Sequence, residues 1–210
     1  MKNLNNIILV GPLATGKSTV AEHLSNITGL RNVPVDKVKW HYRFQNGYDL
    51  VKSRNILRSN GFDALLDYAK DFFGPNDLKD VLSRFEGIID FGATDTHSKD
   101  LSRLAEIYKL LDPYPNIFLI LPYEDESLSE EVLEKRLRKR LKDDPLKGPV
   151  LETYLKKNRE FLYSPNSIAA AKHVIYTNDR PFHHIAQEIY YKCDFAGKGL
   201  SQNRKATMVS

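Results

Sequence analysis

Short apolar runs alternate along the chain with longer amphipathic stretches. We predict five strands, over Asn6–Val10, Asn32–Val35, Gly87–Asp90, Ile117–Leu121 and His173–Tyr176. A stretch of helical character precedes each of the later four strands: Lys17–Thr28, Leu78–Phe85, Lys99–Leu111 and a long region from Ser127 to Ala171. A final helix is expected after the last strand, over Phe182–Tyr191. This alternation predicts an α/β fold with a doubly wound, five-stranded parallel sheet.

Two segments are longer than ordinary connections between a strand and a helix. Residues 37–85 are rich in aromatic side chains and predict a helical cap over one end of the sheet, although we expect most of these aromatics to be core residues. Residues 124–151 begin with acidic and continue with basic residues, an order that complements a helix dipole and is typical of a solvated helix. We predict one domain over residues 1–194, and a disordered basic tail over residues 195–210.

The composition excludes several classes of protein. A hydrophobic content of 41% is too high for wholesale disorder, and the absence of a 20-residue apolar run argues against a membrane-spanning helix and a membrane partner. The single cysteine, Cys193, cannot form an intramolecular disulfide, so we expect a cytoplasmic protein. The net charge is +4, but three of these charges belong to the predicted tail, so the charge alone does not indicate a nucleic-acid partner.

The strongest motif is Gly11-Pro-Leu-Ala-Thr-Gly16-Lys17-Ser18, which lies between a predicted strand and a predicted helix. Two glycines separated by four residues and followed by lysine and a hydroxyl residue are typical of a loop that binds nucleoside triphosphates. Its backbone N–H groups and the helix N-terminus would hold phosphates, Lys17 would contact the β and γ phosphates, and Ser18 would bind Mg²⁺. We therefore expect ATP and Mg²⁺ at Gly11, Ala14, Thr15, Gly16, Lys17, Ser18 and Thr19.

Phosphoryl transfer also needs carboxylates near the acceptor hydroxyl and the metal ion. In a doubly wound sheet these groups come from the carboxyl ends of strands, where Asp36 and Asp90 are expected. Each of them could instead be a helix cap or a turn residue. We expect Asp36 to orient the acceptor hydroxyl and to help Ser18 hold Mg²⁺, whereas Asp90 serves as an alternative base or as a carboxylate beside the metal.

The chain resembles the shikimate kinase-like group of P-loop kinases. Its phosphate loop is similar to the group's GxxGxGKST motif, with Ala14 in place of the middle glycine. Asp36 corresponds to the acidic residue that this group uses near the acceptor, and the companion acid is replaced by Val38. In place of a triple-glycine loop the chain has Asp90-Phe-Gly92-Ala93-Thr94-Asp95, so the resemblance implies substrate contacts at Gly92, Ala93 and Thr94.

Basic residues extend the resemblance towards the C-terminus. Residues 133–140 are similar to the arginine-rich helix that leads into the group's lid, which implies that Arg136 and Arg140 close over the γ-phosphate and that Arg136 also contacts adenine. The segment from Arg159 to Tyr163 is similar to the Arg-x-x-x-Tyr segment whose arginine binds the acceptor's carboxylate. The turn containing Arg180 and Pro181 corresponds to the turn beside adenine.

The resemblance implies an ATP-dependent kinase that phosphorylates a hydroxyl of a small metabolite. We expect an acceptor other than shikimate, because residues 61–66 lack the group's second acceptor-binding arginine. One alternative is a regulatory module that binds or hydrolyses ATP without an acceptor. Another is a nucleotide or polynucleotide kinase, because aromatic residues accompany Arg43, Arg54 and Arg58.

Overall fold

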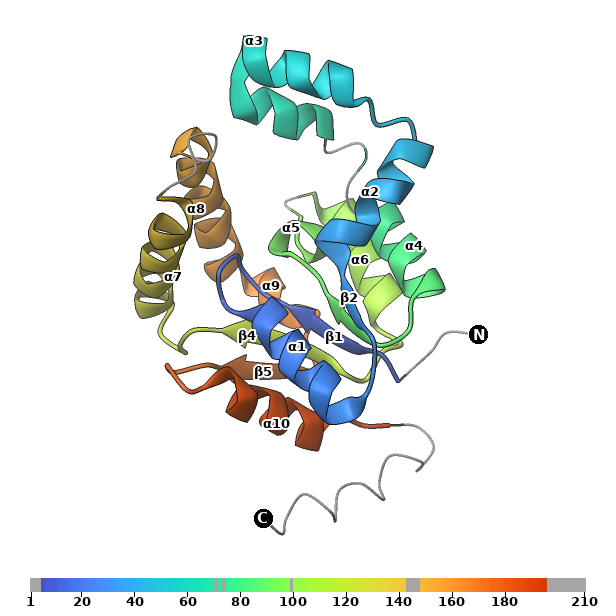
Figure 1. The fold of residues 1–210 in the computed structure, drawn as a ribbon, viewed down its shortest axis with the longest axis vertical. Helices are drawn as coiled ribbons and strands as arrows, with labels where there is room; N and C mark the ends of the chain where they lie inside the picture. Colours follow the sequence, from blue (N-terminus) through green and yellow to red (C-terminus); the bar gives the residue numbers. More distant parts are fainter. Residues whose placement is uncertain (1–4, 70–71, 73–74, 99, 143–147, 196–210) are drawn as a thin grey trace.

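The computed structural model describes residues 5–69, 72, 75–98, 100–142 and 148–195. Its centre is a parallel sheet with the strand order β2-β3-β1-β4-β5 (Figure 1). The strands are β1 (Ile7–Val10), β2 (Asn32–Pro34), β3 (Ile88–Asp90), β4 (Ile117–Leu121) and β5 (His173–Tyr176). The predicted fold class is confirmed, and four of the five strands end where the sequence pattern predicts.

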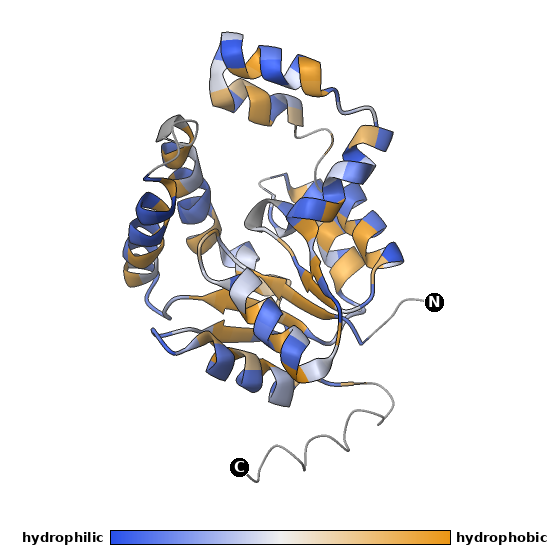
Figure 2. Cartoon of the chain, in the orientation of Figure 1, coloured by the Kyte–Doolittle hydropathy of each residue, from blue (hydrophilic) through white to orange (hydrophobic). Residues whose placement is uncertain are grey.

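Both faces of the sheet are covered by helices, because the strands are apolar on both sides (Figure 2). Ile7 and Leu9 of β1 pack with α1 (Lys17–Thr28) and α10 (Phe182–Lys192). Ile8 and Val10 point to the opposite face, where they pack with residues of α4 (Pro75–Arg84) and α6 (Leu101–Leu111). Because the strands are parallel, the carboxyl ends of β1, β2 and β3 meet at one edge of the sheet. The loops that follow these three strands form the candidate site.

Two helices, α2 (Val35–Gln45) and α3 (Leu50–Ala69), stand beyond this edge of the sheet (Figure 1). Part of the predicted cap, residues 37–85, belongs to the sheet layer instead, because Leu78 and Val81 of α4 are fully buried in the sheet's core. The aromatic residues of the segment are divided in the same way: Tyr42 is buried, whereas Trp40 is 38% exposed. At its kink, α3 reaches α8 (Gly148–Leu162) through the rings of Phe62 and Tyr154.

The long helical region predicted over Ser127–Ala171 consists of three helices in the described residues. These are α7 (Glu126–Leu141), α8 and α9 (Pro165–Ala169). The carboxylate of Asp125 caps α7 by accepting a hydrogen bond of 2.7 Å from the N–H of Leu128. The helices α7 and α8 lie side by side across the site from the cap (Figure 1). Of the predicted lid, residues 124–151, the structure describes α7 and the start of α8.

The end of the described chain differs from the prediction at one residue. Phe195, expected to begin a disordered tail, packs against Tyr190 of α10. The rest of the predicted tail, residues 196–210, lies outside the described residues. No helix in the described part of the chain is long and apolar enough to span a membrane.

Candidate active site

The phosphate-binding loop connects β1 to α1, and its glycines are required by geometry. Gly11 and Gly16 both have positive φ angles, of 146° and 96°. A Cβ atom at Gly16 would lie 2.3 Å from the ring of Phe182, and one at Gly11 would lie 2.5 Å from the carbonyl oxygen of Ile120. The two glycines therefore permit both the backbone conformation and the close packing of the loop. Thr15 stabilises the turn by donating its hydroxyl hydrogen to the carbonyl oxygen of Pro12.

Lys17 lies at the first position of α1 and is 8% exposed. Its ammonium group donates to the carbonyl oxygens of Gly11 and Pro12, at 3.0 and 2.9 Å. Burial lowers the pKa of Lys17, and the nearby carboxylates, with Asp90 first among them, oppose this effect. Arg140 of α7 is also within electrostatic reach, since its charge contributes to the lowered pKa of Lys17.

Ser18 and Asp90 form the contact that links the loop to the end of β3. The Ser18 hydroxyl donates to Oδ2 of Asp90 at 2.6 Å. Burial raises the pKa of Asp90, while Lys17 and the Ser18 hydrogen bond act in the opposite direction. A hydroxyl and a carboxylate oxygen beside a phosphate loop are hard ligands that suit Mg²⁺ completed by water and phosphate. The residues present therefore fit a magnesium ion held by Ser18 and Asp90, whereas the sequence predicted Ser18 and Asp36.

Asp36 lies in the first turn of α2, and its predicted position at the end of a strand is wrong. The strand β2 stops at Pro34, which cannot donate a backbone hydrogen bond, and α2 begins at Val35. The carboxylate of Asp36 is 75% exposed and lies 2.5 Å from the Lys39 ammonium. Neighbouring protein atoms partly desolvate Asp36, which would raise its pKa, but the charge and hydrogen bond of Lys39 outweigh this effect and lower the pKa. Asp36 is therefore held in its ionised form.

Behind Asp36 lie further charged side chains, which the sequence did not assign to the site. Lys39 is 7% exposed and also donates to the buried carboxylate of Asp95, at 3.2 Å. Asp95 in turn accepts a hydrogen bond of 2.9 Å from the N–H of Gly92, which caps the short helix α5 (Ala93–Thr96). One turn beyond Lys39, Arg43 pairs with Asp77 of α4 at 3.2 Å. We refer to Asp36, Lys39, Arg43, Asp77 and Asp95 as the acid-base cluster.

The loop after β3 lies beside this cluster. Gly92 precedes α5, and Ala93 and Thr94 form its first turn. The backbone of this segment is fixed by Asp95, which Lys39 holds from α2. The structure therefore brings the predicted substrate-contacting segment next to the helix that carries Asp36.

Arg136 of α7 contacts the phosphate loop. Its guanidinium group donates to the carbonyl oxygen of Ala14 at 3.4 Å and lies 3.5 Å from the carboxylate of Asp179. Asp179 also accepts a hydrogen bond from the Tyr123 hydroxyl. The loop from β5 to α10 is thus attached to α7 next to the phosphate loop.

Asn158 of α8 is a loop-contacting residue that sequence analysis missed. It is 2% exposed, and its amide exchanges two hydrogen bonds with the backbone of Leu13. Its neighbour Arg159, predicted to bind an acceptor carboxylate, instead pairs with Glu130 of α7 at 2.5 Å. The structure therefore brings Asn158, but not Arg159, against the phosphate loop.

Arg180 and Pro181 lie at the start of α10, as the sequence predicts. Pro181 is the residue before the first turn of α10. Arg180 donates to the carbonyl oxygen of Tyr176 at 2.5 Å and pairs with Glu188 at 2.8 Å. Gly16 packs against Phe182, so this turn adjoins the phosphate loop.

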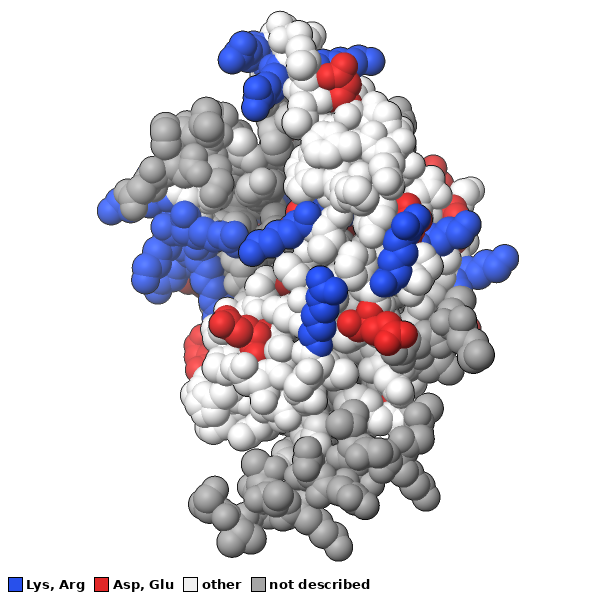
Figure 3. Space-filling model, turned by 45° about the vertical axis from the view of Figure 1, so that its right-hand side comes forward, with Lys and Arg blue, Asp and Glu red and all other residues white. Residues whose placement is uncertain are grey.

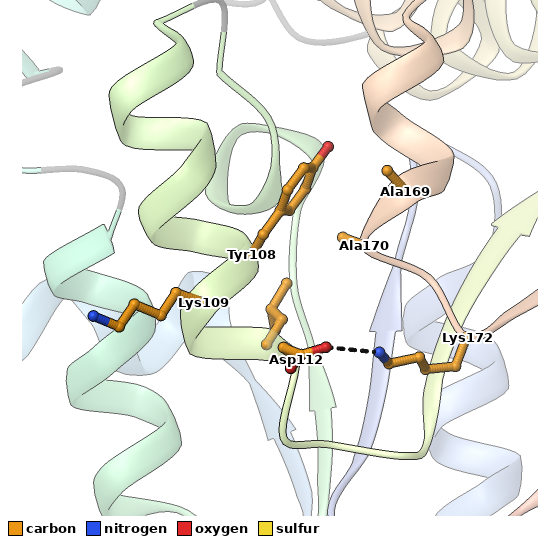
Figure 4. A pocket seen from close by; sticks show the side chains of 7 residues that line it. Tyr108, Lys109, Asp112, Ala169, Ala170 and Lys172 are labelled. Carbon is orange, nitrogen blue, oxygen red and sulfur yellow. Dashed lines mark hydrogen bonds and ion pairs between the residues drawn. The ribbon is translucent and has the colours of Figure 1, made fainter.

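A hollow of about 380 Å³ lies elsewhere, between α6 and α9 (Figure 4). It is at the opposite edge of the sheet, because Lys172 precedes β5 and Asp112 precedes β4. These two side chains pair with each other at 3.1 Å. The hollow contains no residue of the phosphate loop, and we assign no role in nucleotide binding to it.

Comparison with known proteins shows similarity at the level of structure. No protein-family model and no curated protein sequence matches this chain. The structure is similar to that of a shikimate kinase from Acinetobacter baumannii, determined in complex with shikimate, with a TM-score of 0.55, 21% identity, and coverage of 100% of this chain and 97% of that one. Shikimate kinases from Aquifex aeolicus and Bacteroides thetaiotaomicron give TM-scores of 0.51 and 0.53, at 17% and 15% identity. They cover 89% of this chain, and 95% and 96% of their own chains. The chain therefore has the P-loop kinase-like fold of these enzymes.

Proposed function

We propose that this protein is an ATP- and Mg²⁺-dependent kinase that transfers a phosphoryl group to a hydroxyl of a small molecule. The observation that carries the proposal is the contact between Ser18 and Asp90 beside the buried Lys17. It joins a phosphate loop to a carboxylate from the neighbouring strand, which is the arrangement that phosphoryl transfer requires. The fold similarity to shikimate kinases supports the same class of reaction.

The residues of the loop would bind the phosphates of ATP. Lys17 and Ser18 stand at the N-terminus of α1, which adds its positive dipole end, and backbone N–H groups of the loop would donate to phosphate oxygens. Ser18 and Asp90 would hold Mg²⁺, which when bound neutralises phosphate charge. Arg136 and Arg140 would offset the charge on the γ-phosphate from the side of α7. Arg180 and Pro181 would lie beside adenine, at the start of α10.

Asp36 would orient the acceptor hydroxyl. Its carboxylate is exposed, is fixed by Lys39 and remains ionised, so it can accept the hydrogen bond of a hydroxyl group. The backbone of Gly92, Ala93 and Thr94 would contact the acceptor from the neighbouring loop. To bind an acceptor carboxylate, as the sequence predicts, Arg159 would have to leave its half-exposed ion pair with Glu130.

The proposal is tested by measuring ADP formation with Mg²⁺, ATP and a panel of hydroxyl compounds. At least one compound should raise turnover well above the rate without acceptor, and its phosphorylated product should be detectable by mass spectrometry. The Lys17→Ala variant should lose ATP·Mg²⁺ binding and turnover, whereas Lys79→Ala, an exposed change on α4, should lose neither. Normal ATP affinity in Lys17→Ala would contradict the proposed nucleotide site.

Two variants separate the roles of the carboxylates. Asp90→Asn should raise the Mg²⁺ concentration that half-maximal turnover needs, whereas Asp36→Asn should lower kcat with little change in ATP binding. ATP turnover that no acceptor changes would favour the alternative of an ATP-hydrolysing module. Salt-sensitive binding of oligonucleotides would instead favour a polynucleotide kinase.

A further inference from the structure

The charge of the acid-base cluster indicates which charge the acceptor can carry. This inference rests on the proposed function. The cluster consists of Asp36 and the charged side chains behind it, and its residues come from α2, α4 and α5. It contains three carboxylates and two cations. Its formal charge is therefore negative before any acceptor is present.

Both cations of the cluster are already paired. Lys39 lies 2.5 Å from Asp36 and 3.2 Å from Asp95, so one ammonium group serves two carboxylates. Arg43 is 2% exposed and pairs with Asp77 at 3.2 Å. Neither cation could bind an acceptor carboxylate without giving up a buried partner, which is costly in a protein interior.

The cluster has a deficit of hydrogen-bond donors as well as a negative charge. Asp77 is 1% exposed, and its Oδ1 atom has no hydrogen-bond partner among the described residues. Burial, together with the charge of Asp95, raises the pKa of Asp77 to about 6, against the opposing effect of Arg43. An added anion nearby would increase the same repulsion.

Arg159, Lys17 and Arg140 are other basic residues that the sequence predicts at the site. Arg159 is held by Glu130 at 2.5 Å and lies 3.9 Å from Glu134. Lys17 and Arg140 belong to the phosphate side, where the triphosphate of ATP would take their charge. On the face shown in Figure 3, Lys and Arg side chains lie at the top of the molecule, where α3 lies, along the edge on the left, and also in the middle and on the right.

We propose that the acceptor is a hydroxyl compound without negative charge, such as a polyol, a sugar or an amino alcohol, and that hydroxy acids are poor acceptors. An uncharged acceptor can donate hydroxyl hydrogens to Asp36 without disturbing the pairing of Lys39. An acceptor with an ammonium group would in addition offset the excess negative charge of the cluster.

The test uses matched acceptors in the ADP-formation assay with the full chain. Each hydroxy acid, including shikimate and gluconate, is assayed beside its methyl ester, and glucitol and glucosamine are included as uncharged and cationic compounds. We expect the best acceptors to be uncharged or cationic, and kcat/KM for each acid to lie at least about tenfold below that of its ester, the effect of one unit charge across a few ångströms of protein.

Variants of the cluster test the physical cause. Asp95→Asn keeps the side-chain shape and removes one negative charge, so it should reduce the preference for the ester over the acid several-fold. Asp77→Asn offers the same test if Asp95→Asn fails to fold, and Asp63→Asn, an exposed change on α3, should leave the preference unchanged.

The possible failures are distinguishable. An acid that is the best acceptor and surpasses its own ester would overturn this inference while leaving the proposed kinase activity intact. A preference for esters that neither cluster variant alters would overturn the assignment to these charges. Bound ATP·Mg²⁺ without transfer to any compound would overturn the proposed function and this inference together.

Discussion

The side-chain amide of Asn158 forms two hydrogen bonds with the backbone of Leu13. The N–H of Leu13 donates to Oδ1 of Asn158 at 2.9 Å, and Nδ2 of Asn158 donates to the carbonyl oxygen of Leu13 at 3.1 Å. Leu13 lies in the phosphate loop and Asn158 lies on α8, so the pair fixes the loop relative to α8. The position of α8 therefore influences the conformation in which the loop meets phosphate.

We predict that Asn158→Leu, which keeps the size of the side chain, weakens ATP·Mg²⁺ binding by about tenfold. The change leaves the N–H and carbonyl groups of Leu13 without partners, at a cost of about 1–3 kcal/mol for each group that stays buried. Isothermal titration with a non-hydrolysable ATP analogue measures the affinity. Asn158→Asp, which can accept from the Leu13 N–H but cannot donate, should also bind less tightly.

The control for Asn158 is Lys156→Leu, an exposed substitution on the same helix. It should leave ATP affinity unchanged. Equal affinities for the native protein and Asn158→Leu would show that the loop keeps its binding conformation without α8.

Lys39 should control the titration of Asp36. Because the charge and hydrogen bond of Lys39 lower the pKa of Asp36, Lys39→Gln should raise this pKa. A protonated Asp36 has lost the negative charge that attracts the acceptor's hydroxyl hydrogen and cannot take up its proton, so the acid limb of the pH profile of kcat/KM should move to higher pH by about one unit. The matched control is Lys37→Gln, two residues away and exposed. An acid limb that stays in place in Lys39→Gln would mean that Asp36 does not set it.

Much of the sheet could be predicted from local sequence, and less of the site. The strands and the phosphate loop follow from apolar runs and from the glycine spacing, both of which are local signals. Asp36 was placed at a strand end because Val35 continues the apolar run, whereas Pro34 ends the strand and Val35 begins a helix. The spacing of Asp36 and Lys39 by three residues could have suggested their pairing once a helix was assigned there.

Contacts between segments that are far apart in the chain have no comparable signal in the local sequence. Asn158 and Leu13 are separated by 145 residues, and nothing in the pattern of α8 distinguishes an inward-facing asparagine from a surface one. Likewise, the pairing of Arg43 with Asp77 depends on how α2 packs against α4. Such tertiary pairs decide the electrostatics of the site, and they became visible only in the structure.

Ala14 should be a strained residue of the phosphate loop. Its φ angle is 68°, a left-handed conformation that disfavours residues with a Cβ atom. We predict that Ala14→Gly relieves strain of about 1 kcal/mol, partly offset by the greater freedom of glycine in the unfolded chain. Urea denaturation measures the difference. The comparison is Ala105→Gly, in the exposed part of α6, which should destabilise the protein by about 1 kcal/mol.

Asp77 should make the stability of the protein depend on pH between about 4 and 6. Burial raises its pKa in the folded protein to about 6 from 3.8, so in this range the folded state binds a proton that the unfolded state has released. Linkage then requires the contribution of Asp77 to stability to be greatest below pH 3.8, to fall as the pH rises to about 6, and to stay constant above it.

Asp77→Asn isolates this effect, because asparagine resembles the protonated carboxyl group and does not titrate. The free energy of unfolding of the native protein, minus that of Asp77→Asn, should fall as the pH rises from 4 to 6 and then level off. Urea denaturation at a series of pH values measures both quantities, and Asp63→Asn controls for the loss of an exposed carboxylate. A difference that rises with pH over this range would show that Arg43 outweighs burial and that the pKa of Asp77 is lowered. The buried pair of Arg43 and Asp77 would then add to stability at neutral pH.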